Sequence, residues 1–169
     1  MKTYRVFLGL GSNIGDRHRF LQRAVTELKL LPDMRIVWTS AVYESDPYGR
    51  TNQPRFLNAC AEVETTLFPP DLMDRLKDLE QRLGRSSSEH WGPREIDIDI
   101  LVYDGLVHSD GRVTVPHPDL EQRRFVLVPL REIAADLVHP ISGLTVDELA
   151  AACSDQGTIK TTSFHLLIS

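Results

Sequence analysis

The segment spanning residues 91–100 reads WGPREIDIDI, and isoleucine and aspartate alternate strictly over its last five positions. A period of two is typical of a β-strand with one buried face, because successive side chains point to opposite sides of the strand. The isoleucines are therefore predicted to face a core, while Asp97 and Asp99 share the other face. The rest of the fold must place a core on one side of this strand and two carboxylates on the other.

Asp97 and Asp99 lie two residues apart, which separates their carboxylates by roughly 6.5 Å along a strand. At an effective dielectric constant of about 20, two such charges repel by roughly 2.5 kcal/mol. A bound cation removes this repulsion, and Mg²⁺ is commonly held by one or two carboxylates together with substrate phosphates. The pair indicates a candidate magnesium site; the alternative is a solvated strand face with lysine or arginine opposite.

The composition is that of an ordinary globular protein, with 41% hydrophobic and 25% charged residues in a chain of 169. This length suits a sizeable core, so we expect one domain over residues 1–169. The net charge of −5 argues against a general nucleic-acid or anionic-membrane binder. Neither a secretory signal nor an apolar stretch of roughly 20 residues is recognisable. We expect a cytoplasmic protein in which Cys60 and Cys153, which lack metal-ligand spacing, are reduced.

The hydrophobic pattern predicts strands and helices in the order βαββαβ. Strands are expected over residues 4–10, 36–43, 56–63 and 96–103, and helices over residues 16–31 and 69–84. This order is that of the ferredoxin-like fold, an α+β arrangement in which two helices back an antiparallel sheet. The dipeptide Asp104-Gly105 is a hairpin signal. Expected C-terminal additions are a strand at 113–115, a helix at 125–135 and a last helix opened by a capping box at 145–148.

The glycine-rich stretch of residues 9–16, GLGSNIGD, matches neither the dinucleotide-binding nor the Walker spacing. It is predicted to be a strand-to-helix turn whose glycines permit positive φ and in which Ser12, Asn13 or Asp16 caps the helix. Contact between its backbone and a ligand stays open. The turn-rich loop of residues 44–54 is long enough to indicate a function.

Basic residues suited to phosphate accompany the aspartate strand. Arg85 and Arg94 bracket a polar loop, and a guanidinium group donates paired hydrogen bonds to phosphate oxygens. Such groups near a carboxylate-metal pair suit phosphoryl-type transfer, which depends on positioning and charge neutralisation. Arg112, His117 and Arg123 offer further donors. The alternatives are simple solvation of the arginines and a structural hydrogen bond from His117, which two prolines hold stiffly.

The same segments carry a resemblance to a known family. GLGSNIGDR, NQPRFLNACAEVET, LGR followed by WGPREIDIDIL, and VPHPDLEQRRFVLVPL occur in this order. In this combination the chain resembles the 6-hydroxymethyl-7,8-dihydropterin pyrophosphokinases of folate biosynthesis over nearly its whole length. The resemblance implies a ferredoxin-like fold and pyrophosphoryl transfer from ATP to 6-hydroxymethyl-7,8-dihydropterin, giving AMP and the pterin diphosphate.

The resemblance also implies roles for individual side chains. Asp97 and Asp99 would bind two Mg²⁺ ions that bridge the ATP phosphates, and Arg85 and Arg94 would act catalytically by clamping the triphosphate. The residues implied in ATP binding are Glu80, Arg85, Arg94, Ile100, Arg112, Thr114, His117 and Arg123. Those implied in pterin binding are Ser45, Pro47, Tyr48, Phe56, Asn58, Trp91 and Phe125.

The chain departs from the family pattern at Lys77, Glu95 and residues 86–88, none of which is implied in catalysis. The expected partners are ATP and the pterin, with no nucleic acid and no membrane, and a monomer is expected. Two other classes compete. A metal-dependent hydrolase or nucleotidyltransferase would form AMP without a pterin. A ferredoxin-like RNA-binding module is disfavoured by the acidic charge and by the missing aromatic pattern of such sheets.

Overall fold

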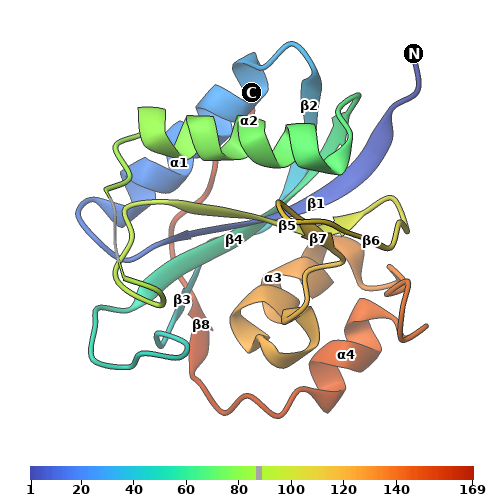
Figure 1. Cartoon of the computed structure of the whole chain (residues 1–169). Helices are drawn as coiled ribbons and strands as arrows, with labels where there is room; N and C mark the ends of the chain where they lie inside the picture. Colours follow the sequence, from blue (N-terminus) through green and yellow to red (C-terminus); the bar gives the residue numbers. More distant parts are fainter. Residues whose placement is uncertain (87–88) are drawn as a thin grey trace.

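The computed structural model describes residues 1–86 and 89–169 (Figure 1). Its strands are β1 (Tyr4–Ser12), β2 (Met34–Thr39), β3 (Tyr43–Ser45), β4 (Phe56–Thr65), β5 (Asp97–Tyr103), β6 (His108–Ser109), β7 (Thr114–Val115) and β8 (Ile159–Thr161). Its helices are α1 (Arg17–Leu30), α2 (Pro69–Arg82), the 3-10 turn η1 (Leu120–Gln122), α3 (Arg124–Ala134) and α4 (Val146–Ala152).

The main sheet is antiparallel and has the strand order β5-β1-β4-β3-β8, with β2 also paired to β4. β1 lies between β4 and β5, and its register places Tyr4 opposite Thr65 and Ser12 opposite Leu57. With α1 and α2 as the connecting helices, this is the ferredoxin-like core, so the predicted fold class is confirmed. The ribbon of β6 and β7, the helices α3 and α4, and β8 are the predicted C-terminal additions.

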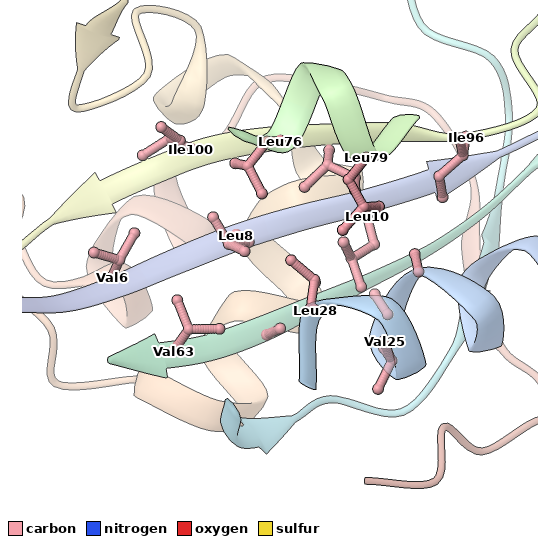
Figure 2. Close-up of a cluster of buried hydrophobic side chains, with 14 of the residues drawn as sticks. Val6, Leu8, Leu10, Val25, Leu28, Val63, Leu76, Leu79, Ile96 and Ile100 are labelled. Atoms are coloured by element: carbon pink, nitrogen blue, oxygen red, sulfur yellow. The ribbon is translucent and has the colours of Figure 1, made fainter. Parts of the chain in front are cut away.

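Helices α1 and α2 cover one face of the main sheet (Figure 1). Asp16 caps α1, since its carboxylate accepts a hydrogen bond from the Arg19 backbone nitrogen at 3.1 Å, and Gly84 follows α2 with φ 97°. Full burial of an aliphatic side chain contributes roughly 1.5–3 kcal/mol, so this face supplies much of the stability. Figure 2 shows the core side chains meeting there: Val6, Leu8 and Leu10 of β1, Leu76 and Leu79 of α2, and Val25 and Leu28 of α1.

Helices α3 and α4 cover only part of the opposite face. Phe7, Cys60 and Leu101 are buried there beneath α3 and α4. The predicted capping box of α4 is present, with reciprocal hydrogen bonds between Thr145 and Glu148. The remaining part of this face, at the C-terminal end of β1 and the N-terminal ends of β4 and β5, lines a cavity instead.

The strand predicted over residues 36–43 is interrupted, which corrects that expectation. At the break between β2 and β3, Glu132 of α3 accepts hydrogen bonds from the Ala41 backbone nitrogen at 2.9 Å and from the Tyr43 hydroxyl at 2.5 Å. A partner more than 85 residues away therefore satisfies the backbone where the ladder stops.

Asp104 and Gly105 form the predicted tight turn, with φ values of 44° and 71°. The hairpin prediction itself is wrong, because β6 pairs with β7 rather than back onto β5. Cys60 and Cys153 are both free, as expected. Within the described residues, no helix has the length and apolar character needed to cross a membrane.

Candidate active site

A cavity of about 210 Å³ opens on the part of the sheet face that α3 and α4 leave uncovered. Strands β1, β4 and β5 form its floor, and the start of α3 and the loops after β3 and α2 form its walls. Of the residues implied in function, those that line it are Ser45, Tyr48, Phe56, Asn58, Trp91, Arg94, Asp97, Asp99, His117, Arg123 and Phe125. Side chains from distant segments of the chain thus meet in one place.

A second cavity, of about 290 Å³, adjoins the first, because Asp99 and His117 line both. Ile100, Arg112 and Thr114 also line this second cavity. Of the residues implied in ATP binding, four line the second cavity, with His117 at the junction, while Arg94 and Arg123 line the first cavity. Two compartments that meet at a carboxylate suit a reaction between two bound substrates.

Gly9 and Gly11 leave the floor of the first cavity without side chains. A Cβ atom at Gly11 would lie 3.2 Å from Asn58 Oδ1 and 3.6 Å from Phe56 Cδ1, so any larger residue would press on these neighbours. Gly9 belongs to β1 as the strand predicted over residues 4–10 requires, whereas the predicted turn is wrong for Gly11, which also belongs to β1. It is correct for Gly15, whose φ is 70°.

Asn58 presents a fixed amide at the cavity floor. Its Nδ2 donates to Ser45 Oγ at 2.6 Å, and both side chains are almost fully buried. Phe56 lies two residues away on β4 and lines the same cavity. An oriented amide beside an aromatic ring is suited to a flat heterocycle with polar edges.

Aromatic rings form the opposing wall of the first cavity. The centroid of the Tyr48 ring lies 5.6 Å from that of Trp91 and 5.7 Å from that of Phe125. Arg123 Cζ lies within 5.8 Å of all three ring centroids. Trp91 has a φ of 64°, a conformation that is strained for a bulky residue and that concentrates at ligand-binding sites.

Asp97 is held by two arginines. Arg85 Nη1 donates to Asp97 Oδ1 at 3.0 Å, and Arg94 Nη1 donates to Asp97 Oδ2 at 3.0 Å. Burial opposes ionisation of Asp97, but Arg94, Lys77 and Arg85 together hold its pKa below the usual value. The two arginines implied in phosphate binding thus form ion pairs with a carboxylate implied in metal binding.

Glu80 of α2 supports Arg85 from the side of the helical core. Its carboxylate is only 2% exposed and accepts hydrogen bonds from Arg85 Nη1 at 2.5 Å and from the Ile98 backbone nitrogen at 2.7 Å. Lys77 Nζ adds a third contact at 3.3 Å. Among the described residues, Glu80 and Arg85 line neither cavity, so the geometry gives Glu80 a direct contact with an arginine of the site.

Asp99 is compensated much less than Asp97. Its ion pair within the described chain is a long one, 3.9 Å to Arg123 Nη1. Burial and the neighbouring Asp97 carboxylate raise the pKa of Asp99 to about 7. A negative charge at this position is therefore unfavourable until a cation arrives.

His117 lies at the junction of the two cavities with an uncharged imidazole ring. Burial, aided by the positive charge of Arg123, lowers its pKa to about 4. Its Nδ1 accepts a hydrogen bond from the Asp119 backbone nitrogen at 3.1 Å, which assigns the ring proton to Nε2. The ring thus makes a structural bond with one nitrogen and keeps a donor on the other.

Asn13 and Gln53 connect the two loops over the first cavity, and the sequence did not predict this role. Asn13 Nδ2 donates to Gln53 Oε1 at 2.9 Å, while Asn13 Oδ1 accepts from the Arg94 backbone nitrogen at 2.7 Å. Gln53 Nε2 donates to the Trp91 carbonyl at 2.7 Å. Amide pairs that meet across 40 residues leave no local pattern, so only the length of the loop hinted at them.

The remaining predicted or departing positions that the structure describes line neither cavity. Pro47 lines neither cavity among the described residues, whereas its neighbour Asp46, which was not predicted, lines the first. Glu95 accepts hydrogen bonds from the Ser86 backbone nitrogen at 3.3 Å and from Ser86 Oγ at 2.7 Å. The other positions of the departure at residues 86–88 lie outside the described residues.

Comparison with known proteins shows the family to which the chain belongs. A family model described as 7,8-dihydro-6-hydroxymethylpterin-pyrophosphokinase matches residues 7–135. Over 153 residues the chain is 47% identical to the 2-amino-4-hydroxy-6-hydroxymethyldihydropteridine pyrophosphokinase of Methylorubrum extorquens, covering 90% of this chain and 96% of that protein. The Pseudomonas aeruginosa protein of the same name is 41% identical, covering 90% and 94%.

Among solved structures, the chain is similar to the HPPK-DHPS of Plasmodium falciparum crystallised with pterin and p-hydroxybenzoate. The TM-score is 0.70 at 16% sequence identity, and the match covers 89% of this chain and 42% of that one. The chain thus spans about two fifths of that protein, and this likeness supports the fold alone.

Fold, cavities and matches define a transferase of the pyrophosphokinase class, which confirms the predicted enzyme class. The chain belongs to the 7,8-dihydro-6-hydroxymethylpterin-pyrophosphokinase family, whose members serve folate biosynthesis with ATP as co-substrate.

Proposed function

We propose that the two cavities bind the two substrates of one reaction, pyrophosphoryl transfer from ATP to 6-hydroxymethyl-7,8-dihydropterin, within one domain formed by residues 1–169. The observation that carries the proposal is the shared lining of the cavities by Asp99 and His117. A triphosphate that extends out of the second cavity reaches these residues. A pterin in the first cavity brings its hydroxymethyl group to the same place.

The pterin ring is assigned to the first cavity. The glycine floor leaves room for a flat ring, the Asn58 amide offers hydrogen bonds to its polar edge, and aromatic side chains supply its apolar walls. The residues proposed to contact the ring or to shape its loop are Ser45, Pro47, Tyr48, Phe56, Asn58, Trp91 and Phe125.

The nucleotide is assigned to the second cavity and the junction. The residues proposed to bind it are Ile100, Arg112, Thr114, His117 and Arg123, with Arg85 and Arg94 on its phosphates and Glu80 behind them. His117 offers Nε2–H to a phosphate oxygen, because its other ring nitrogen is already engaged.

Asp97 and Asp99 are proposed to hold two Mg²⁺ ions together with ATP. Both carboxylates line the first cavity, and the raised pKa of Asp99 indicates a site that gains from an added cation. No group of three or more His, Cys, Asp or Glu residues suited to a metal occurs in the described chain, but Mg²⁺ takes only one or two carboxylates when phosphates complete its shell. When bound, Mg²⁺ would neutralise charge on the transferred phosphates.

Arg85 and Arg94 are proposed to leave Asp97 and to bind the triphosphate. A phosphate is a stronger hydrogen-bond acceptor for a guanidinium group than a carboxylate whose oxygens bind a metal ion. Within the described residues, the buried Nε atoms of Arg94 and Arg123 have no hydrogen-bond partner, so both side chains retain donors for a ligand.

In the reaction, the hydroxymethyl oxygen of the pterin forms a bond to the β-phosphorus of ATP. The bond from that phosphorus to the oxygen bridging the α-phosphorus breaks, and AMP leaves with the electron pair. The arginines neutralise the charge that collects on the bridging oxygen. The hydroxymethyl proton passes to solvent, since His117 already carries a proton on its free nitrogen.

The test is to incubate the protein with ATP, Mg²⁺ and the reduced pterin and to measure AMP and pterin diphosphate by chromatography. Equal amounts of the two products, with no AMP when the pterin is omitted, are expected. AMP formation without pterin would instead assign the site to a hydrolase or nucleotidyltransferase. Sedimentation of the same sample tests the expected monomer.

A further inference from the structure

The segment between α4 and β8 runs past the start of α3 to the outer edge of β3 (Figure 1). β8 pairs with β3 in antiparallel register, with Ile159 opposite Ser45. The family model ends at residue 135, so this segment lies beyond the part of the chain that defines the family. Its contacts nevertheless reach one wall and the floor of the first cavity.

At one end of the segment, Asp155 caps helix α3 from a distance. Asp155 Oδ2 accepts a hydrogen bond from the Arg124 backbone nitrogen at 3.1 Å, and Oδ1 accepts from the Gly157 backbone nitrogen at 2.8 Å. Arg123, the residue at the N-cap position of α3, makes no capping bond with its own side chain. A carboxylate at this position accepts a hydrogen bond from a free N–H group and interacts favourably with the positive end of the helix dipole.

The start of α3 carries part of the candidate active site. Arg123 and Phe125 flank the capped residue Arg124, and both line the first cavity. Asp155 fixes the backbone from which the Phe125 ring projects. The Arg123 guanidinium has a separate anchor, because its Nη2 donates to Asp119 Oδ2 at 3.1 Å.

At the other end, Thr158 is joined to Asp46 in both directions. The Asp46 backbone nitrogen donates to the Thr158 carbonyl at 3.1 Å, and the Thr158 nitrogen donates to Asp46 Oδ2 at 3.0 Å. The residue before Asp46 is Ser45, whose hydroxyl accepts the 2.6 Å hydrogen bond from the Asn58 amide. Thr158 thereby holds the end of β3 that orients Asn58.

We propose that residues 155–158, here called the strap, set the spacing between the wall that carries Phe125 and the part of the floor that carries Asn58, with Asp155 as a positioning residue for the pterin. Three residue steps span at most about 10 Å, so this wall and the floor cannot move apart without breaking one anchor. The proposal rests on the assignment of the pterin to the first cavity. It predicts a selective effect, because the strap holds the segments of Phe125 and Asn58, both assigned to the pterin, whereas the neighbouring ATP residue Arg123 is held by Asp119.

The test is a steady-state comparison of Asp155→Ala, Asp155→Asn and wild type, with Asp136→Ala as an exposed aspartate control. Asp155→Ala is expected to raise KM for the pterin at least fivefold, while kcat and KM for ATP change less than twofold. Asp155→Asn keeps one acceptor oxygen and should fall between Asp155→Ala and wild type. A fluorescence titration of each variant with the pterin alone should show the same order of affinities.

A pterin KM for Asp155→Ala equal to that of Asp136→Ala overturns the proposal. An equal rise in KM for both substrates also overturns it, because that pattern reports a general loss of structure. Melting temperatures ensure that the assays are made on folded protein.

Gly157→Ala provides a second variant if Asp155→Ala does not fold. A Cβ atom at Gly157 would lie 3.1 Å from Asp155 Oδ1, so it crowds the carboxylate without removing it. A smaller rise in pterin KM alone is expected, and no rise overturns the strap. Wild-type protein that makes no pterin diphosphate would refute the proposed function instead, so the two failures are distinguishable.

Discussion

The two faces of the central sheet are built by the same strands and yet serve opposite needs. On β1, Leu8 and Leu10 enter the core beneath α1 and α2, while Gly9 and Gly11 open the floor of the first cavity on the other side. On β5, the isoleucines are buried on the first face and the aspartates line the cavity on the second. Each residue step changes the requirement from packing to chemistry.

The difference shows how a strand divides stability from activity. The face covered by α1 and α2, here called the helical face, is filled with aliphatic side chains whose burial favours folding. The opposite face, here called the open face, has glycines in place of side chains, two neighbouring carboxylates and the strained residue Trp91. None of these features stabilises the fold by itself. Substitutions on the two faces should therefore separate cleanly into losses of stability and losses of turnover.

The largest expected contrast is between Asp99→Ala on the open face and Leu8→Ala on the helical face. Asp99→Ala should lower kcat by about 1000-fold or more and leave the fold intact, because it removes a charge needed only for the substrates. Leu8→Ala should cost about 2–5 kcal/mol of unfolding free energy and keep kcat per folded molecule. Urea unfolding and steady-state kinetics measure both. An unstable but active Asp99→Ala would show that the carboxylate is structural, and Asp97→Ala should match Asp99→Ala in turnover.

Arg85→Ala and Arg94→Ala should each lower turnover by roughly 100- to 1000-fold, with a smaller effect on ATP affinity. The reason is that guanidinium groups contribute most where charge reorganises in the transition state. Lysine at either position should restore activity only in part, since it keeps the charge but loses the planar pair of donors. Single-turnover rates and nucleotide affinities distinguish the two effects. Weakened ATP binding with an unchanged chemical step would make these arginines anchors for the nucleotide.

Much of this division could be read from the sequence. The alternation in residues 96–100 predicted both faces of β5, because a period of two needs no tertiary information. The element order predicted the ferredoxin-like core, because hydrophobic periodicity alone distinguishes its helices from its strands. The interruption between β2 and β3 could not be predicted, since the partner of its backbone is Glu132 on a distant helix.

The supporting contacts of the site were less accessible to sequence. Glu80 was expected beside the nucleotide, yet its carboxylate is buried against Arg85 and the Ile98 backbone. This contact depends on how α2 packs on β5, which local patterns do not encode. The loop-connecting role of Asn13 and Gln53 could not be predicted for a related reason, because each amide meets its hydrogen-bond partner only after the two loops have come together.

Gly11→Ala tests whether the bare floor serves the pterin. The added methyl group would lie 3.2 Å from the Asn58 amide oxygen, so we expect about a tenfold rise in pterin KM and little change in the ATP constant, consistent with about 1.4 kcal/mol of lost binding energy. Gly111→Ala is the matched control, because a Cβ atom there meets nothing within 4 Å and Gly111 lies in the second cavity. Steady-state kinetics of both variants measure the effect. A lower melting temperature with unchanged pterin KM would contradict the assignment of the floor.

The smallest expected effect is on the free energy of unfolding, which substitutions of the two aspartates of the open face should change in opposite directions. The folded pKa of Asp99 lies above its unfolded value, so the folded protein binds more protons and loses stability as pH rises from about 4 to 7. Asp99→Asn should remove this loss and stabilise the metal-free protein by about 1 kcal/mol at pH 8, after allowance for screening. Asp97 has a lowered pKa and holds Arg85 and Arg94, so Asp97→Asn should destabilise the protein by a similar amount at pH 8. Urea unfolding in EDTA at pH 5 and pH 8 measures both signs, and a shift in the same direction for the two variants would show that the arginines do not discriminate between these carboxylates.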